Sequence, residues 1–467
     1  MQENLLSCFK AYDIRGQINV NIDGNIAYRI GRAVAQHFSA RVIVVGHDAR
    51  ATSPEFASAV ARGVLDAGGD VLEIGLCGTE EMYWAVTEFE ASAGIEVTAS
   101  HNPIDYNGMK IVKSGSCPLD DTEDFQPIKK LASSQAWQEV AIKGTLRDMS
   151  AVARDRYVDR VLSFPQIENL KPLRIVVNAG NGAAGPTFDA IAKRLDKLGA
   201  PLEFIRVHHE PDATFPNGIP NPLLPENHAA TGDVVRLHGA DFGVAFDGDF
   251  ARCFLFNGDG NFVPGEYVVG LLASIFLQRE RGGKIVHDPR VIWNSIDIIK
   301  LLNGVAIQSK TGHTFIKQAM RREEEVYGGE MSAHHYFRDF AYCDSGMMPW
   351  LLVAELVTSS GKSLSDWIGN RSEKFPSSGE INFRVKYADV AITRVLDRYR
   401  EGAAIDEMDG VSLSFDDWRF NLRKSNTEPL VRLNIEGKQR ADLIGARVEE
   451  ISQLIQTKKY AQKVPTS

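Results

Sequence analysis

The sequence is poor in the features that mark several large classes of protein. It contains only five cysteines in 467 residues, an odd number that is widely scattered and never spaced as CxxC. This pattern argues against a disulfide framework and against a structural zinc site, so we expect reduced thiols. The chain also lacks any apolar run of about eighteen residues, and its start lacks the pattern of a secretory signal. We therefore expect a soluble protein of the cytoplasm with no membrane partner.

Positive charge is also scarce. The 52 lysines and arginines are outnumbered by 61 aspartates and glutamates, which gives a formal net charge of −9. Such a balance opposes nonspecific attraction to nucleic acid, to membranes and to anionic substrates, so we expect no nucleic-acid partner. A site for phosphate would have to be built from arginines that cluster locally.

Alternating strand and helix signals fill the first three quarters of the chain. Its length exceeds what one hydrophobic core organises, which predicts three or four compact units. The first unit reads as a strand at 41–45, a helix at 53–66 with Ser53 as N-cap, and a strand at 71–74. The same order recurs twice, with strands predicted at 173–177, 202–207, 242–246, 284–287 and 305–307, and helices at 267–278, 296–302 and 315–322. This repetition predicts three α/β units with mostly parallel sheets.

The C-terminal part of the chain follows a different pattern. Short strands at 381–385, 411–415, 418–422 and 430–435 precede a helix with one apolar face, so we expect a small α+β domain. Polar or turn-rich stretches at 143–150, 257–260 and 374–379 are candidate linkers. The predicted domains span 1–150, 151–257, 258–373 and 374–467.

The loop TASHNP at 98–103 follows a short strand-like segment, so Ser100 lies where a strand ends and can present its hydroxyl in a crevice. The turn that follows leads to Lys110, a cation that this arrangement places near the hydroxyl. A plain turn is the alternative. So is a hydrolase nucleophile with His101 as its base, although adjacent residues in an extended loop usually point apart.

Two carboxylates follow the predicted strand at 242–246. Asp247 and Asp249 are separated by one glycine and can converge on one hard cation, and magnesium prefers such oxygen ligands together with phosphate and water. A solvated turn is one alternative. A haloacid-dehalogenase-like nucleophile is another, but that reading expects the strand to open its domain, whereas here it comes late.

Two further loops carry polar side chains suited to a phosphosugar. In GGEMSAHH, Glu330 and Ser332 can take sugar hydroxyls, while the adjacent histidines diverge and make a poor metal site. The stretch RKSNTEP joins two predicted strands and has the composition of a phosphate cradle, with Arg423, Ser425, Asn426 and Thr427 as its binding groups. A glycine turn and a basic hairpin turn are the respective alternatives.

Taken in this order, the segments resemble those of the α-D-phosphohexomutase family, in particular its bacterial phosphomannomutase (phosphomannomutase/phosphoglucomutase) members. The resemblance covers essentially the full length and rests on KAYDIRG at 10–16, TASHNP, YNGMK, DGDF, KTGH at 310–313, GEMS and RKSNTEP. It implies three related mixed-sheet α/β domains, followed by a smaller α+β domain of the TATA-box-binding-protein-like type.

The activity implied by the resemblance is an isomerase that interconverts mannose 6-phosphate and mannose 1-phosphate, and the glucose phosphates as well. Ser100 would carry the phosphate, hexose 1,6-bisphosphate would serve as intermediate and activator, and Mg²⁺ would be the cofactor. Hexose phosphates would be the small-molecule partners of a monomer or homodimer. A phosphosugar phosphatase and a catalytically silent phosphosugar-binding protein remain as alternatives.

The resemblance also implies roles for individual residues. Ser100, Asp247 and Asp249 resemble magnesium ligands, and Glu330 and Ser332 resemble the pair that holds sugar hydroxyls. The loop with Arg423, Ser425, Asn426 and Thr427 resembles the one that grips the phosphate not being transferred. The other implied site residues are His101, Tyr12, Arg15, Lys110, Arg252, Arg290 and His313. Arg15, Lys110 and His313 are all candidates for the group that deprotonates the attacking hydroxyl.

One residue departs from the family pattern. The metal loop of the family reads DGDxDR, but this chain has Ala251 in place of the third aspartate. A methyl group cannot ligate a cation, so Asp247, Asp249 and a phosphoserine oxygen would have to hold magnesium with water in the remaining position. We expect weak magnesium binding and slow turnover.

Overall fold

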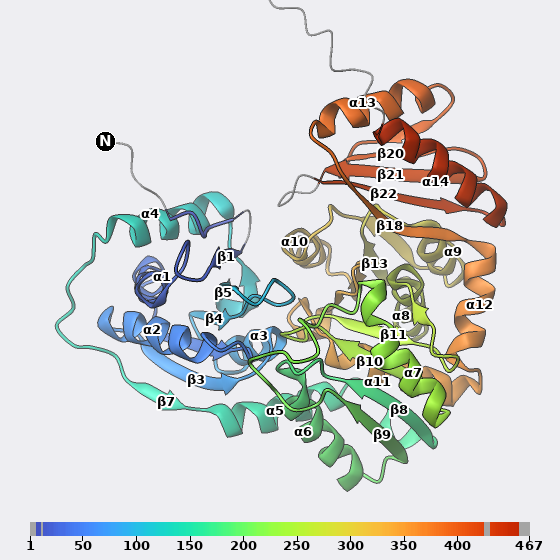
Figure 1. Cartoon of the computed structure of the whole chain (residues 1–467). Helices are drawn as coiled ribbons and strands as arrows, with labels where there is room; N and C mark the ends of the chain where they lie inside the picture. The colour runs from blue at the N-terminus through green and yellow to red at the C-terminus, as the bar shows by residue number, and fades with distance from the viewer. Residues whose placement is uncertain (1–5, 11–12, 425–429, 457–467) are drawn as a thin grey trace, which may run out of the picture. The chain divides into compact units, whose positions relative to one another are not determined.

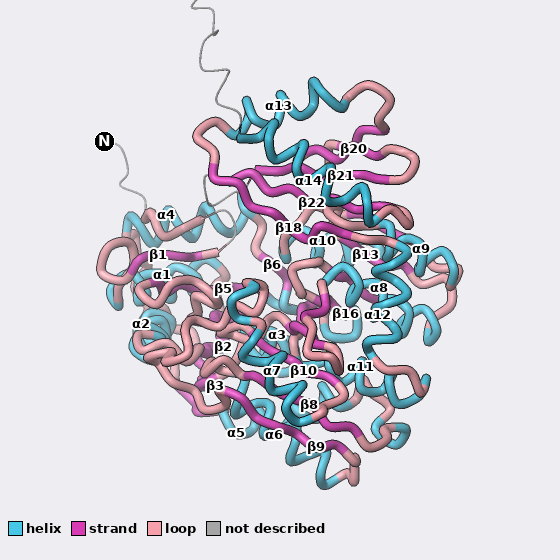
Figure 2. The backbone as a smooth tube through the Cα atoms, turned by 45° about the vertical axis from the view of Figure 1, so that its right-hand side comes forward, coloured by secondary structure: helices cyan, strands magenta, loops and turns pink. Residues whose placement is uncertain are grey.

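The computed structural model describes residues 6–10, 13–424 and 430–456. Its contacts divide the chain into two compact units. Unit 1 comprises Met1–Val263, Met320–Tyr327 and Ser332–Leu364, and unit 2 comprises Pro264–Ala319, Gly328–Met331 and Ser365–Ser467. The predicted alternation of strands and helices is present in both (Figures 1 and 2). Within the described ranges, no helix combines the length and the apolar character needed to cross a bilayer.

The first sheet, in unit 1, is mixed. Its strand order is β1-β5-β4-β2-β3-β7, with β6 paired to β5. The strands are β1 (Ile14–Gln17), β2 (Val42–His47), β3 (Asp70–Leu76), β4 (Ala93–Val97), β5 (Tyr106–Lys113), β6 (Cys117–Pro118) and β7 (Leu146–Asp148). Pairings among β2, β3, β4 and β7 are parallel, whereas those of β5 with β1, β4 and β6 are antiparallel. The expectation of a mostly parallel sheet is wrong here, because the short TASHNP connection from β4 to β5 can join only antiparallel neighbours.

Helices pack against this sheet, and a hydrophobic core lies between the sheet and the helices. Ile43 and Val45 of β2 join a core with α1 (Gly24–His37), α2 (Ser53–Asp66) and α4 (Gln126–Ser134). Val44 is equally buried but points to the opposite face, as alternation along a strand requires. Helix α3 (Thr79–Glu88) packs against β4 and β2. These helices fix the end of β4, where the serine loop begins.

Two details differ from the sequence prediction. The N-cap of α2 is Thr52, and Ser53 is the first helical residue. The Ser53 hydroxyl is engaged elsewhere, because it donates to Oδ1 of Asp48 at 2.6 Å. The polar stretch at 143–150 contains β7, a short strand that pairs with β3 and was not predicted.

The second sheet also belongs to unit 1. Its order is β12-β11-β10-β8-β9, with β8 (Leu173–Asn178), β9 (Leu202–Val207) and β10 (Phe242–Phe246) parallel. Strands β11 (Cys253–Phe256) and β12 (Phe262–Val263) form an antiparallel hairpin, so the segment at 257–260 is its turn. The accompanying helices are α5 (Ser150–Leu162), α6 (Ala184–Lys197) and α7 (Ala229–His238). The carboxyl end of β10 leads directly into the two-aspartate loop.

The third α/β region is divided between the units. Unit 2 holds α8 (Gly265–Arg279), the parallel pair β13 (Lys284–His287) and β14 (Val305–Gln308), and α9 (Trp293–Leu301). Unit 1 holds α11 (Met347–Ser360) and the antiparallel pair β16 (His335–Phe337) and β17 (Cys343–Asp344). The elements whose residues belong to both units are α10 (His313–Glu323), β15 (Tyr327–Gly329) and α12 (Leu364–Lys374).

The C-terminal region of unit 2 confirms the predicted α+β domain. Five antiparallel strands have the order β18-β22-β21-β20-β19. They are β18 (Ser377–Arg384), β19 (Ala404–Asp406), β20 (Val411–Ser414), β21 (Trp418–Lys424) and β22 (Leu430–Gly437). Helices α13 (Ala388–Tyr399) and α14 (Ala441–Gln456) pack together against this sheet and share one apolar core with it (Figure 1).

Candidate active site

Ser100 is held in a strained turn at the end of β4. Its φ is +49°, a left-handed conformation that residues other than glycine rarely adopt. The Thr98 hydroxyl oxygen accepts a hydrogen bond from the Ser100 backbone N–H at 2.8 Å. The Ser100 hydroxyl donates to Oδ2 of Asp247 at 2.6 Å. Strain of this kind is typical of functional sites, and here it aims a nearly buried hydroxyl at a carboxylate.

The serine loop and the two-aspartate loop touch through their backbones. A Cβ atom placed on Gly248 would lie only 2.6 Å from the carbonyl oxygen of Ser100. Glycine is therefore the residue that lets the two loops approach this closely. The DGD spacing thus serves two purposes, because it brings Asp247 to the serine and sets two carboxylates beside each other.

The two carboxylates have different partners. Oδ2 of Asp249 accepts hydrogen bonds from the Thr79 hydroxyl at 2.6 Å and from Lys110 Nζ at 2.8 Å. Burial raises the pKa of Asp249, but the charge and hydrogen bond of Lys110 outweigh it and hold that pKa well below its ordinary value. Burial and the neighbouring Asp249 raise the pKa of Asp247, although the charge of Arg252 opposes the shift. Asp249 therefore keeps its charge more firmly than Asp247 does.

The oxygen atoms of this cluster fit a magnesium ion. Oδ1 of Asp249 is buried and has no hydrogen-bond partner among the described residues. Such an orphaned carboxylate oxygen is where a hard cation would bind, together with Asp247 and the Ser100 oxygen. Ala251 is also buried and offers only a methyl group. Within the described residues, no group of three or more histidines, cysteines and acidic residues could hold a metal ion.

Three of the predicted cations bind the serine loop or the aspartate loop. Lys110 is buried against Asp249, and although burial opposes the ammonium charge, Asp249 raises the pKa of Lys110 above its ordinary value. Arg252 Nε donates to Asp247 at 2.9 Å. Arg15 donates to the carbonyl oxygen of Thr98. These residues are the local positive charge that the acidic composition requires.

His101 does not act as the base of a hydrolase triad in this geometry. Its Nδ1 lies 3.1 Å from the Ser100 oxygen but also faces the Arg252 guanidinium. A guanidinium only donates, so Nδ1 accepts from Arg252, and the serine proton goes to Asp247 instead. His101 is exposed as a whole residue, but burial of its ring among the site residues and the charge of Arg252 lower the pKa of His101 well below its ordinary value.

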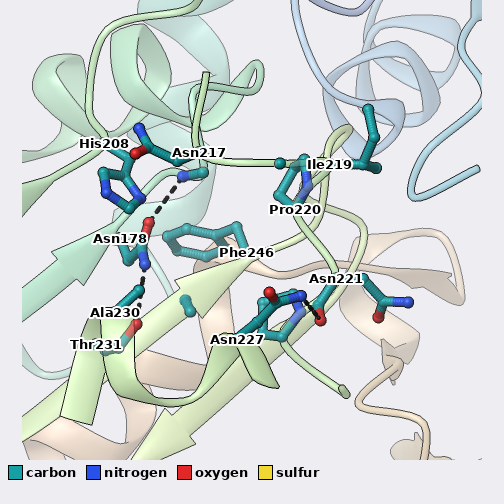
Figure 3. Close-up of a pocket in the computed structure, with 14 residues that line it drawn as sticks. Asn178, His208, Asn217, Ile219, Pro220, Asn221, Asn227, Ala230, Thr231 and Phe246 are labelled. Atoms are coloured by element: carbon teal, nitrogen blue, oxygen red, sulfur yellow. Dashed lines mark hydrogen bonds between the residues drawn. The ribbon is translucent and has the colours of Figure 1, made fainter. Parts of the chain in front are cut away.

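A small pocket beside β10 is too small to bind a sugar. Figure 3 shows side chains from the ends of β8 and β10 and from the 217–222 loop around a cavity of about 40 Å³. Asn178 joins the end of β8 to α7, since its Nδ2 donates to the Thr231 hydroxyl at 3.0 Å, and its Oδ1 accepts from Gly180 N at 2.9 Å. A space of this size holds only a few waters.

Unit 2 contains a second polar cluster. Arg290, just after β13, binds Asp288 through Nε and Nη2 at 3.1 and 2.8 Å. Its guanidinium also lies 3.7 Å from Glu330, whose Oε1 accepts from the Gly312 backbone at 2.8 Å. Burial opposes the charge of Arg290, but Asp288 raises the pKa of this residue further above its already high value. Arg290 and Glu330 are thus brought together as predicted, and His313 begins the nearby helix α10.

Arg423 joins this cluster through an acid that was not predicted. The β21–β22 register places Arg423 opposite Arg432. Glu380 of β18 lies between them, 3.2 Å from Arg423 and 3.0 Å from Arg432. Burial and Arg290 lower the pKa of Arg423, while Glu380 opposes the shift. Glu380 thus holds the Arg423 guanidinium in place at the end of β21.

The predicted site residues therefore fall into three groups. Unit 1 brings together Ser100, His101, Arg15, Lys110, Asp247, Asp249 and Arg252, and it also contains Ser332. Unit 2 contains Arg290, His313, Glu330 and Arg423. Tyr12, Ser425, Asn426 and Thr427 lie outside the described residues. Thr79, Glu380 and Arg50 were missed, because none of them belongs to a motif that signals its contacts.

Comparison with known proteins gives the family. Models of the phosphoglucomutase/phosphomannomutase family match the whole domain series: alpha/beta/alpha domain I at 7–138, domain II at 155–260, domain III at 264–375 and the C-terminal domain at 380–453. A phosphomannomutase of Salmonella montevideo is 54% identical over 455 residues, which cover 97% of this chain and 99% of the relative. A protein of Xanthomonas campestris named as phosphohexose mutases is 50% identical over 452 residues, which cover 96% of this chain and 99% of the relative.

A solved structure agrees with these matches. A phosphoglucomutase/phosphomannomutase family protein from Burkholderia thailandensis superposes with a TM-score of 0.84 at 28% identity, over 99% of both chains. The class is thus an enzyme with three mixed-sheet α/β domains and a C-terminal domain, a phosphomutase within the isomerases. The chain belongs to the phosphoglucomutase/phosphomannomutase family.

Proposed function

We propose that the chain interconverts mannose 6-phosphate and mannose 1-phosphate, and the glucose phosphates as well, through a phosphorylated Ser100 and a hexose 1,6-bisphosphate. The observation that carries this proposal is the Ser100 hydroxyl, which lies 2.6 Å from Asp247 in a cluster that includes Asp249 and Lys110. The high identity to relatives named phosphomannomutase supports mannose phosphate as the substrate.

The reaction consists of two balanced phosphoryl transfers. In the first, the phosphoserine P–O bond breaks, a new P–O bond forms to the O1 or O6 oxygen of the sugar, and the proton that this hydroxyl loses ends on the released Ser100 oxygen. In the second, the P–O bond to the other sugar oxygen breaks, a new P–O bond forms to the Ser100 oxygen, and the proton that the serine loses ends on the released sugar oxygen. Such transfers depend mainly on positioning and charge neutralisation, which the surrounding cations supply.

Asp247, Asp249 and the phosphorylated Ser100 are the residues that would hold magnesium. When bound, the ion would neutralise charge on the oxygens of the phosphate being transferred. Burial opposes the charge of Lys110, but Asp249, 2.8 Å from its Nζ, raises the pKa of Lys110 above its ordinary value, so among the three candidate bases it serves better as a positive charge than as a proton acceptor. Arg15 and His313 remain the candidates for deprotonating the sugar hydroxyl.

Other candidate residues would bind the rest of the substrate. We assign Glu330, together with Ser332, to the sugar hydroxyls. The groups assigned to the phosphate that is not transferred are Arg423, Ser425, Asn426 and Thr427. Buried guanidinium groups suit this task because they bind phosphate through paired, charge-assisted hydrogen bonds. Tyr12, Arg252 and Arg290 complete the proposed substrate contacts.

Mannose 1-phosphate and glucose 1-phosphate should both be substrates, with mannose preferred. The two sugars differ only at C2, and we assign Glu330 and Ser332 to other hydroxyls, so neither sugar is excluded by a lost buried contact. Parallel coupled assays of the two substrates with hexose 1,6-bisphosphate present measure the two kcat/KM values. No turnover of mannose 1-phosphate would refute the proposed preference.

Replacing Arg423 by alanine should raise KM about tenfold and lower kcat much less, because a charge-assisted bond to the retained phosphate contributes mainly to binding. Some loss of rate is expected, since remote binding also positions the reacting end. Arg398→Ala is the matched control, because Arg398 lies in the same domain and pairs with Glu450 on α14. If KM were unchanged and kcat fell sharply, Arg423 would instead be assigned to the phosphate that is transferred.

A further inference from the structure

One short motif occurs twice in the chain. His47-Asp48-Ala49-Arg50 follows β2, and His287-Asp288-Pro289-Arg290 follows β13. In both copies, histidine Nδ1 lies 2.9 Å from the aspartate carbonyl oxygen. In both, the arginine N–H donates to aspartate Oδ1, at 3.0 and 2.9 Å. The same turn is therefore built at the carboxyl ends of two parallel strands, and each copy directs an arginine toward a neighbouring loop.

In the first copy, the arginine holds the serine loop. Arg50 Nη1 donates to the carbonyl oxygens of Pro103 at 2.8 Å and Tyr106 at 3.0 Å. Its Nη2 donates to the carbonyl oxygens of Ser100 at 3.0 Å and Asn102 at 2.5 Å. Arg50 is only 3% exposed, so these bonds form away from water. One guanidinium thus binds four carbonyl oxygens of the segment that connects β4 to β5.

The surroundings of Arg50 fix the guanidinium itself. Its Nε lies 3.6 Å from Oδ2 of Asp48, and its plane faces the ring of Phe215 at 5.8 Å. Asp48 also binds the Ser53 hydroxyl, which in turn accepts from Asn107 at the start of β5. The turn after β2 therefore holds the connection at several points along its length.

We propose that Arg50 is a positioning residue that fixes the backbone of the serine loop and so aims the Ser100 oxygen at the transferring phosphate. Only a planar group with several fixed donors can satisfy four carbonyl oxygens at once, and a lysine ammonium has neither the number nor the geometry of donors. Without these bonds, the left-handed turn at Ser100 loses its support. The inference rests on the proposed function.

Arg50→Lys tests this role, with Arg29→Lys as the matched control. Arg29 also binds carbonyl oxygens, those of Ala132 at 2.7 Å and Ser133 at 3.0 Å, but in α4 instead of the serine loop. We expect kcat to fall about tenfold or more in Arg50→Lys with KM nearly unchanged, because a misplaced nucleophile slows the transfer without weakening binding. Arg29→Lys should keep the kcat of the original chain.

Amide hydrogen exchange gives a readout that does not depend on turnover. Arg50→Lys should speed exchange in a peptide covering 98–108, and Arg29→Lys should speed it in a peptide covering 129–134. In Arg50→Ala, millimolar guanidinium ion should restore part of kcat, which a generally damaged fold would not allow.

The role of Arg50 would be overturned if kcat fell equally in the two lysine variants. It would also be overturned if Arg50→Lys changed only KM, or if its amide exchange at 98–108 were unchanged. The same holds if the fall of kcat only follows a fall in the folded fraction. If the original chain does not turn over hexose phosphates at all, the proposed function fails, and the exchange comparison still decides whether Arg50 holds the loop.

Discussion

Replacing Ser100 by alanine should abolish turnover, with kcat lowered by at least about 10⁴-fold, as expected for loss of a covalent nucleophile. The fold should survive, because among the described residues the side chain bonds only to Asp247 and His101, and Asp247 keeps its bonds to Arg252. Steady-state mutase assays and thermal unfolding of the purified variant measure the two effects.

Ser116→Ala is the matched control for this variant. Ser116 is also buried, has a left-handed φ of +55°, and donates its hydroxyl to the carbonyl oxygen of Tyr83. The Ser116→Ala variant should be somewhat less stable than the original chain and should keep its turnover. Retained turnover in Ser100→Ala, or stoichiometric phosphate on another residue with Ser100 unmodified, would contradict the assignment of the nucleophile.

Replacing Ala251 by aspartate should strengthen magnesium binding by on the order of 100-fold and raise turnover with it. A full charge beside a buried divalent cation is worth several kcal/mol before its own desolvation is subtracted. The original chain offers magnesium two carboxylates, those of Asp247 and Asp249, and Oδ1 of Asp249 has no hydrogen-bond partner among the described residues. Calorimetric titration with magnesium, alongside the mutase assay, measures both quantities.

The stability of this variant should depend on magnesium. Residue 251 is only 1% exposed, so the introduced carboxylate lowers the melting temperature without metal, and added magnesium should restore it by binding the folded state. Ala251→Asn is the matched control, since it has nearly the same shape without the charge. Equal magnesium affinity and turnover in the original chain and Ala251→Asp would show that a third carboxylate is dispensable.

Much of the fold follows from local patterns. Strands β9, β10 and β13 occur with the predicted bounds, because each is a short segment with several β-branched or aromatic residues. Strand β5 was not predicted, because the residues at 106–108 were interpreted as a turn, whereas the structure places them in the strand Tyr106–Lys113. The length of the TASHNP connection was the signal that could have predicted an antiparallel pair.

Some of the site residues could likewise be predicted from local motifs, and others could not. Ser100, Asp247 and Asp249 stand in compact motifs at strand ends, so their proximity could be predicted. Thr79 could not, because it meets Asp249 across 170 positions of sequence. Glu380 reaches its arginines through the register of β18 with β22, which no local pattern reports. Residues that act through tertiary contacts can therefore be identified only from the structure.

Phosphorus NMR of the chain with mannose 1-phosphate, magnesium and a trace of hexose 1,6-bisphosphate tests the central claim most directly. We predict that the mannose 1-phosphate signal converts to that of mannose 6-phosphate with total esterified phosphate conserved, and that the rate depends on the bisphosphate. Accumulation of inorganic phosphate would instead show a phosphatase. Unchanged spectra would show a protein that only binds phosphosugars, and either result would contradict the account.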